Sequence, residues 1–86
     1  MKSSELAIER IRKVMSETFQ LNGESVTLET KNTDIALWDS LGHLNLMMAI
    51  EEEFEIRMDI EEIADISSVG DIVIVINKKV KTNHQI

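Results

Sequence analysis

Residues 39–54 read Asp-Ser-Leu-Gly-His-Leu-Asn-Leu-Met-Met-Ala-Ile-Glu-Glu-Glu-Phe, and this stretch decides the fold. Most of its residues are good helix formers, and Gly42 is the only helix breaker among them. Asp39 and Ser40 each carry a side-chain oxygen that can accept a hydrogen bond from the free N–H groups at a helix start. The pattern therefore predicts a helix over residues 40–55, capped by one of these two residues.

The apolar residues of this helix fall into two stripes, and the second stripe begins beside Ser40. One stripe has the spacing of a face that packs on other helices. The other is rotated away from it, and an exposed apolar stripe that includes a methionine is typical of an adaptable docking surface. The alternative is that a helical core buries both. The first stripe consists of Leu46 or Met47, Ile50 and Phe54, and the second of Leu41, Leu44 and Met48.

Three further helices are predicted, over about residues 4–20, 60–65 and 68–80. Ser3 or Ser4 is expected to cap the first. The β-branched run 72–76 would suit a buried strand by composition alone, but Ser68 and Asp71 have the spacing of a capping box, and lysines follow at the expected C-terminal end. The sequence thus predicts an all-α fold. We expect a small four-helix bundle, with three longer helices and one short helix, formed by a single domain over residues 1–86.

A long polar segment, residues 23–39, connects the first two helices. A loop of this length is unusual in so small a domain and is often functional. It carries scattered apolar residues that we expect to anchor it on the core, namely Val26, Leu28, Ile35, Leu37 and Trp38.

Composition narrows the class of function. A chain of 86 residues buries a thin core, which favours a platform or carrier over an enzyme with a deep pocket. There is no cysteine, so any thiol chemistry must come from a cofactor. The N-terminus does not resemble a signal peptide, and no apolar run is long enough to span a bilayer, so we expect a cytoplasmic protein without membrane insertion.

The net charge of −7 is concentrated in the middle of the chain. Residues 32–77 hold eleven acidic side chains against the single base Arg57. Such a field disfavours nucleic acid and favours protein partners with basic patches. The alternative is that the acids only keep a small domain soluble.

The stretch Asp39-Ser40-Leu41 resembles the Asp-Ser-Leu phosphopantetheine attachment motif of acyl carrier proteins, and residues 46–54 are similar to the rest of that family's second helix. The short helix at 60–63 and the start of the last helix at 67–69 also fall where the family has them. The resemblance covers about residues 4–80.

The resemblance implies a role for several residues. Ser40 would bear 4′-phosphopantetheine, added by a phosphopantetheinyl transferase that uses Mg2+ and coenzyme A, and Asp39 would assist recognition beside it. The arm would hold an acyl group as a thioester, sheltered by the apolar core, and present it to acyl-loading and acyl-processing enzymes. The protein itself would be a non-catalytic, monomeric carrier without a metal site. The positions that would contact partners are Leu41, Leu44, Met48, Glu51 and Glu52.

Some residues depart from the family pattern. Gly42, His43 and Asn45 stand where carriers of fatty acid synthesis commonly have further acids. Trp38 and His43 resemble carriers of specialised routes, such as polyketide, mixed peptide or acylated-sugar synthesis. We expect His43 to be a surface or partner contact, since no second histidine or cysteine stands near it in the sequence. Gly42 suggests either close approach by a partner or tolerance near the helix end.

Three alternatives remain open from the sequence. Ser40 could be only a helix cap. The chain could be a peptidyl or D-alanyl carrier, although the Asp before Ser40 favours an acyl cargo. It could also be a carrier-like module that is never modified and serves only protein interaction. An EF-hand is excluded by the spacing of the acids.

Overall fold

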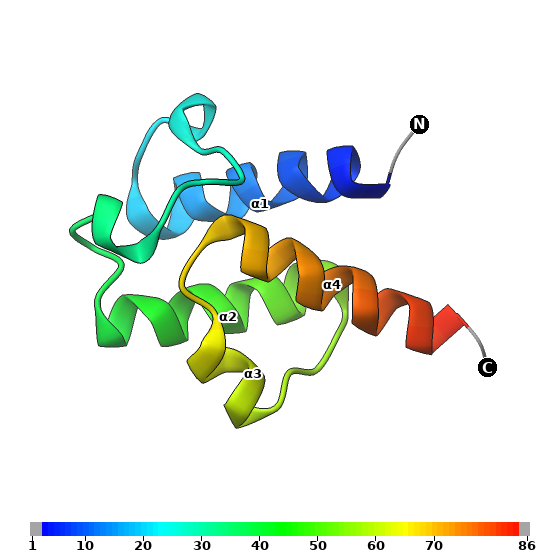
Figure 1. The fold of residues 1–86 in the computed structure, drawn as a ribbon. Helices are drawn as coiled ribbons and strands as arrows, with labels where there is room; N and C mark the ends of the chain where they lie inside the picture. The colour runs from blue at the N-terminus through cyan, green and yellow to red at the C-terminus, as the bar shows by residue number, and fades with distance from the viewer. Residues whose placement is uncertain (1–2, 85–86) are drawn as a thin grey trace.

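Residues 3–84 form four α-helices, as the sequence predicts (Figure 1). The computed structural model describes residues 3–84, and their side chains from residue 7 to residue 79. The caps predicted at Ser3 and Ser4 therefore lie outside the described side chains. Two short 3-10 turns, η1 (Gly23–Ser25) and η2 (Asn32–Asp34), lie in the long loop. The helices are α1 (Ser3–Phe19), α2 (Ser40–Phe54), α3 (Ile60–Asp65) and α4 (Val69–His84).

The β-branched run 72–76 is helical, so the strand alternative is wrong. Ser68 caps α4 as predicted, because its hydroxyl accepts a hydrogen bond from the N–H of Asp71 at 3.1 Å. The Asp71 carboxylate accepts from the N–H of Ser67 rather than of Ser68, which lowers the pKa of Asp71. Within residues 3–84, no helix is both long and apolar enough to cross a membrane.

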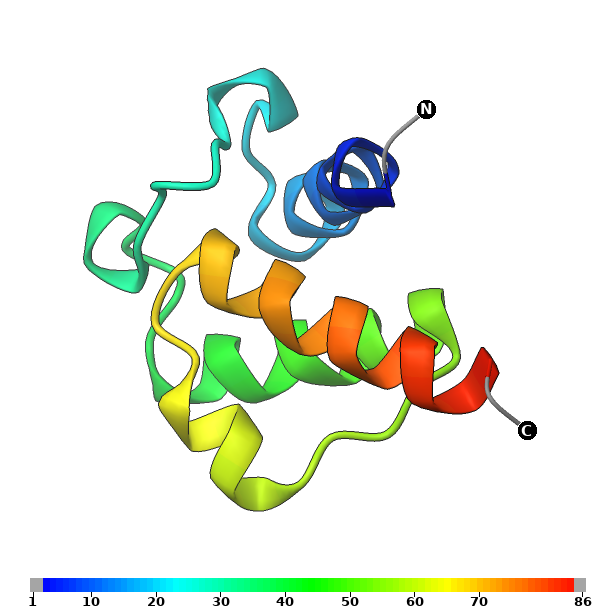
Figure 2. The same ribbon diagram turned by 45° about the vertical axis from the view of Figure 1, so that its right-hand side comes forward.

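The helices α1, α2 and α4 enclose the core. In Figure 1, α1 runs in one direction and α2 and α4 run back beside it, and α3 lies on the side away from α1 in both views (Figures 1 and 2). No polar or charged side chain is buried among those described, so burial of apolar surface dominates the stability of this core. Its fully buried members include Ile11, Met15, Leu46, Met47, Ile50, Val69 and Ile72.

The long loop is fastened to the start of α4 by its backbone. The N–H groups of Val69 and Gly70 donate to the carbonyls of Thr30 and Leu28, each at 2.9 Å. The first N–H groups of a helix have no partner inside the helix, so the loop supplies the missing acceptors. The loop and the last helix are therefore one unit, although forty residues separate them in sequence.

Three of the five predicted loop anchors are confirmed. Val26 and Trp38 are buried, and Ile35 packs partly buried against the core. Leu28 and Leu37 remain about half exposed, so their prediction as anchors is wrong. Their backbone carbonyls, rather than their side chains, make the contacts that matter: that of Leu28 with α4, and that of Leu37 with α2.

Gly42 is buried in the first turn of α2, against the protein's own loop. A Cβ atom at this position would overlap the carbonyl oxygen of Leu37 and lie 3.1 Å from the Phe19 ring. Gly42 is therefore required by close approach within the fold. The two explanations expected from sequence, a partner's approach and tolerance near the helix end, are both wrong.

We predict that Gly42→Ala destabilises the protein. Alanine adds about 1 kcal/mol of helix propensity, but overlap with a fixed backbone carbonyl costs about 1 to 3 kcal/mol and forces the loop outward. Urea unfolding should show a net loss. Asn45→Ala, at an exposed position of the same helix, is the control and should be neutral or slightly stabilising. A Gly42→Ala protein as stable as the wild type would contradict the close packing.

Candidate functional site

The start of α2 exposes a serine that the fold does not use. Asp39 is the cap, because its Oδ1 accepts a hydrogen bond from the N–H of Gly42 at 2.8 Å. Ser40 is the first residue of the helix and is exposed. Among the described residues, its hydroxyl has no hydrogen-bond partner. The sequence left the cap open between the two residues. The structure assigns it to Asp39, so the alternative that Ser40 serves only as the cap is wrong.

An open groove of about 640 Å3 lies beside Ser40, between the start of α2 and α3. Its walls are mostly apolar, and Ser40 is one of the few polar residues among them. The groove therefore offers an apolar surface directly next to a free hydroxyl. The apolar lining is Trp38, Leu44, Ile60, Ile63, Ala64 and Ile66, and the polar lining is Asn32, Asp39, Ser40 and His43.

His43 lies in the wall of this groove, hydrogen-bonded on both sides of its ring. Its Nδ1 lies 2.8 Å from Nε1 of Trp38, and its Nε2 lies 2.7 Å from the carbonyl oxygen of Ile63. The imidazole lies nearly coplanar with the Trp38 ring, at an angle of 15° and with ring centres 6.2 Å apart. His43 is thus half-buried and bonded within the fold, which the prediction of a surface or partner contact did not include. The sequence did not predict the contact between Trp38 and His43, because a separation of five residues across a helix start is not a recognised pairing pattern.

The two apolar stripes of α2 separate as predicted. Leu46, Met47 and Ile50 are fully buried, and Phe54 packs partly buried against the core. Leu41, Leu44 and Met48 are 68%, 53% and 61% exposed. The alternative that the core buries both stripes is therefore wrong, and an exposed apolar stripe runs along α2 from the neighbour of Ser40.

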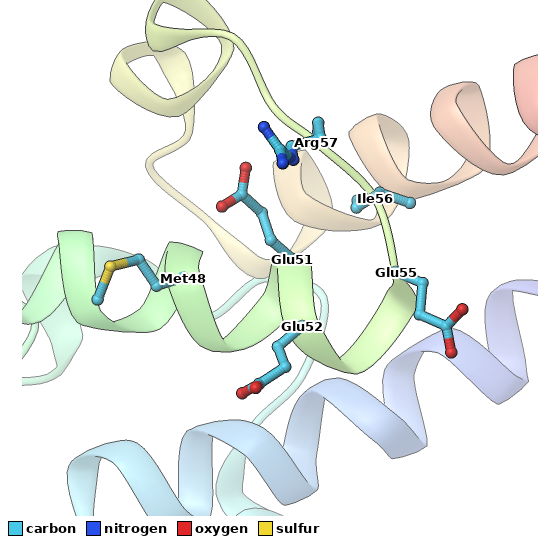
Figure 3. Close-up of a pocket in the computed structure, with 6 residues that line it drawn as sticks. All are labelled: Met48, Glu51, Glu52, Glu55, Ile56 and Arg57. Atoms are coloured by element: carbon cyan, nitrogen blue, oxygen red, sulfur yellow. The ribbon is translucent and has the colours of Figure 1, made fainter.

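The acidic end of α2 continues this surface. Figure 3 shows a shallow hollow there, whose lining comes from α2 and the segment after it. Glu51 and Arg57 lie on one side of the helix end, and Glu52 points to the other. Glu52 is exposed, whereas Glu51 is half-buried and accepts a hydrogen bond from the N–H of Met58 at 2.8 Å. Glu51 therefore helps to hold the segment after α2, a role that the sequence did not reveal.

Glu53, the third acid of the run, is half-buried and pairs with a basic side chain of α1. Its carboxylate accepts a hydrogen bond from Nε of Arg10 at 2.9 Å, and the Arg10 guanidinium lies over the Phe54 ring, 4.3 Å from its centre. This pairing ties α1 to the end of α2. The exposed acidic surface is therefore smaller than the sequence suggests.

The wall of the groove that α3 forms is fastened to α4 by Glu62. The Glu62 carboxylate accepts a hydrogen bond from the N–H of Asp59 at 2.8 Å and lies 2.9 Å from Nζ of Lys79 and 3.3 Å from Nζ of Lys78. The Asp59 hydrogen bond and then the Lys79 contact lower the pKa of Glu62 from 4.5 to about 2. The same pair raises the pKa of Lys79.

Comparison with known proteins identifies the same architecture. Residues 9–76 match the family model described as phosphopantetheine attachment site. Acyl carrier proteins are similar in sequence: that of Thermotoga maritima is 37% identical over 92% of this chain and 98% of its own, and that of Clostridium acetobutylicum is 34% identical over 79% and 88%.

Solved structures agree. The crystal structure of the Thermotoga maritima acyl carrier protein superposes with a TM-score of 0.80 and 28% identity, over 92% of each chain. The solution structure of holo acyl carrier protein from Geobacter metallireducens superposes with a TM-score of 0.82 and 26% identity, over 92% of this chain and 91% of that one.

The fold, with its free surface along the second helix, is that of a small helical carrier protein. The chain belongs to the phosphopantetheine attachment-site family, as an acyl carrier protein. The family resemblance, the all-α four-helix fold and 4′-phosphopantetheine as covalent cofactor are thereby confirmed.

We predict that Glu62→Gln destabilises the protein in a pH-dependent way. Glutamine keeps an acceptor for the Asp59 N–H but removes the charge that faces the lysines. Because the native pKa is depressed, the charge stabilises the fold fully above pH 4.5, and this contribution is lost as the pH falls toward 2. Urea unfolding should show a loss of about 1 kcal/mol at neutral pH that shrinks in acid.

Glu61→Gln, on the exposed side of the same short helix, is the matched control and should have little effect at any pH. A wild-type advantage over Glu62→Gln that stays constant from neutral pH to below pH 4.5 would show that the charge of Glu62 does not fasten α3 to α4.

Proposed function

We propose that this protein carries an acyl group as a thioester on 4′-phosphopantetheine attached to the Ser40 hydroxyl. The observation that carries the proposal is the state of that hydroxyl: exposed, free of hydrogen bonds among the described residues, and next to an apolar groove. A nucleophile that the fold does not use is open to modification. The family to which this chain belongs is described by phosphopantetheine attachment. The Ser40 hydroxyl is available for that attachment, because it has no role in holding the fold together.

The surroundings of Ser40 fit a phosphate diester. The residue stands at the first position of a fifteen-residue helix, where free N–H groups and the positive end of the helix dipole favour an anion. Asp39 takes the cap and thereby leaves the serine oxygen available. When bound, the group supplies the terminal thiol that a chain without cysteine lacks.

The groove supports an acyl rather than an aminoacyl cargo. Its apolar walls include Leu44, Ile60 and Ile63. Its only ionisable residues are Asp39, which precedes Ser40, and His43, which is hydrogen-bonded to Trp38. An apolar chain gains from burial there, whereas the ammonium group of an aminoacyl cargo would lose hydration without a partner. Holding the chain in the groove is the work of these side chains, and the partner enzymes perform the chemistry.

The surface along α2 supports docking of basic partners. Leu41 and Met48 provide apolar contact, and Glu52 adds exposed negative charge at the far end. Such a surface suits the phosphopantetheinyl transferase and acyl-processing enzymes with basic patches. Trp38 and His43 beside the serine support a specialised biosynthetic route. We extend the proposal to a single cytoplasmic domain over residues 1–86 that acts as a monomer without catalytic residues.

Loading of Ser40 is tested by intact-protein mass. After incubation with coenzyme A, Mg2+ and a broad-specificity phosphopantetheinyl transferase, the wild type should gain one phosphopantetheine group. Ser40→Ala should gain none, and Ser25→Ala, which removes an exposed hydroxyl in the loop, should be loaded like the wild type. No gain with several transferases would favour an unmodified interaction module and overturn the proposal.

Docking is tested by a matched pair of exposed apolar residues. Leu41, on α2, and Ile74, on α4, are 68% and 66% exposed, so their replacement by asparagine removes similar apolar surface. We predict that Leu41→Asn lowers the kcat/KM of loading by the transferase about tenfold, as expected for one apolar contact of an interface. Ile74→Asn should leave kcat/KM unchanged. Equal effects of the two substitutions would show that the transferase does not dock on the exposed stripe.

A further inference from the structure

A chain of two hydrogen bonds crosses the wall of the groove through His43. Trp38 Nε1 lies 2.8 Å from His43 Nδ1, and His43 Nε2 lies 2.7 Å from the Ile63 carbonyl oxygen. An indole N–H can only donate, so Nδ1 must be an unprotonated acceptor. A carbonyl oxygen can only accept, so Nε2 carries the proton. The contacts are therefore satisfied only by neutral His43 with its hydrogen on Nε2.

These two hydrogen bonds join three separate elements. Trp38 ends the long loop, His43 lies in the first turn of α2, and Ile63 lies in α3. All three residues line the groove beside Ser40. The hydrogen bonds therefore fix the distance between the two sides of the groove, where the joined residues His43 and Ile63 are twenty positions apart in sequence.

Few other interactions hold α3. None of its six residues is buried, although Ile63 packs partly buried against the core. Its main other attachment is Glu62, which faces the lysines of α4 and not the groove. A short helix with little buried surface opens at low cost, so the bond from His43 has a large share in its position.

Trp38 is the buried end of this pair of hydrogen bonds. It is 4% exposed, and its ring stacks on Phe19 with ring centres 5.9 Å apart. His43 is half-buried and its ring lies nearly coplanar with the indole, at 15°, so it is more accessible to solvent than Trp38. The ionisable partner of the pair is thus the accessible one.

We propose that His43 is a positioning residue for the groove beside Ser40, and that its protonation opens the groove wall. Protonation turns Nδ1 into a donor that faces the indole N–H, so two donors meet and the Trp38 bond is lost. The ring then turns away from Trp38, and α3 loses its connection to the loop. The part of the proposal that concerns the acyl chain rests on the proposed function of Ser40.

The charged groups on the elements around His43 have partners of their own or do not line the groove. Asp39 lines the same groove, but its carboxylate already accepts from the Gly42 N–H. On α3, Glu62 faces the lysines of α4, while Glu61 and Asp65 are exposed and do not line the groove. No lysine or arginine lines it among the described residues.

The connection is tested first in Ser40→Ala protein, which cannot be loaded. Trp38 is the only tryptophan, so its indole N–H gives a single NMR resonance that reports the bond directly. As His43 is protonated, followed by its own ring signals, that resonance should move to the position found in His43→Leu. His84→Gln removes the other of the two histidines and should leave this titration unchanged.

The matched variant is His43→Gln, whose amide offers an acceptor and a donor about as far apart as the two ring nitrogens but does not ionise. Its indole resonance should lie near that of the neutral wild type and stay there across the same pH range. A wild-type resonance that ignores the ionisation of His43, or an equal titration in His43→Gln, would overturn the proposal. Neither result depends on attachment at Ser40.

The effect on cargo is tested in protein loaded with octanoyl-phosphopantetheine and verified by mass. At one neutral pH, cleavage of the thioester by hydroxylamine should be several-fold faster in His43→Leu than in the wild type, and His43→Gln should resemble the wild type. Equal cleavage in all three proteins would overturn the role of His43 in sheltering the cargo. Failure to load at all would instead count against the proposed function of Ser40.

Discussion

The close approach of the Leu37 carbonyl to Gly42 fixes where the second helix begins, and the rest of the site depends on it. Because the helix has no side chain at this position, the loop can pass directly over its first turn. The loop then delivers Trp38 into the core and leaves Asp39 to cap the N–H of Gly42. With the cap taken by Asp39, the hydroxyl of Ser40 has no structural duty and stays exposed at the positive end of the helix.

One helix therefore carries apolar residues on a buried face and on an exposed face. The buried stripe of α2 contributes Leu46, Met47 and Ile50 to a core without buried polar side chains. The other stripe is exposed to solvent and adds nothing to the stability of a thin core. An exposed apolar stripe of this kind is typical of an interaction surface. The groove beside Ser40 extends this surface toward α3. Cofactor attachment, cargo and docking can thus all be built along the first two turns and the outer face of a single helix.

Much of this could be predicted from the sequence, because helix period and capping are local properties. The spacing of apolar residues in α2 separated inside from outside correctly, and the cap at Ser68 identified a helix in spite of its β-branched run. What failed was long-range. His43 looked like a surface residue because its partners, Trp38 and the Ile63 carbonyl, meet it only after folding. The hydrogen bond from the N–H of Met58 to the Glu51 carboxylate was likewise not visible in the sequence.

The sequence by itself determined the helices, the buried and exposed stripes of α2 and the family resemblance, since each follows from residues close together in the chain. Only the tertiary structure decided that Asp39 rather than Ser40 caps the helix, that Gly42 makes room for the protein's own loop, and that α3 closes a groove at the serine. These features arise where segments distant in sequence meet. Their contacts depend on the position of backbone carbonyls. Every residue has a backbone carbonyl, so the residue type does not reveal which carbonyl makes a contact.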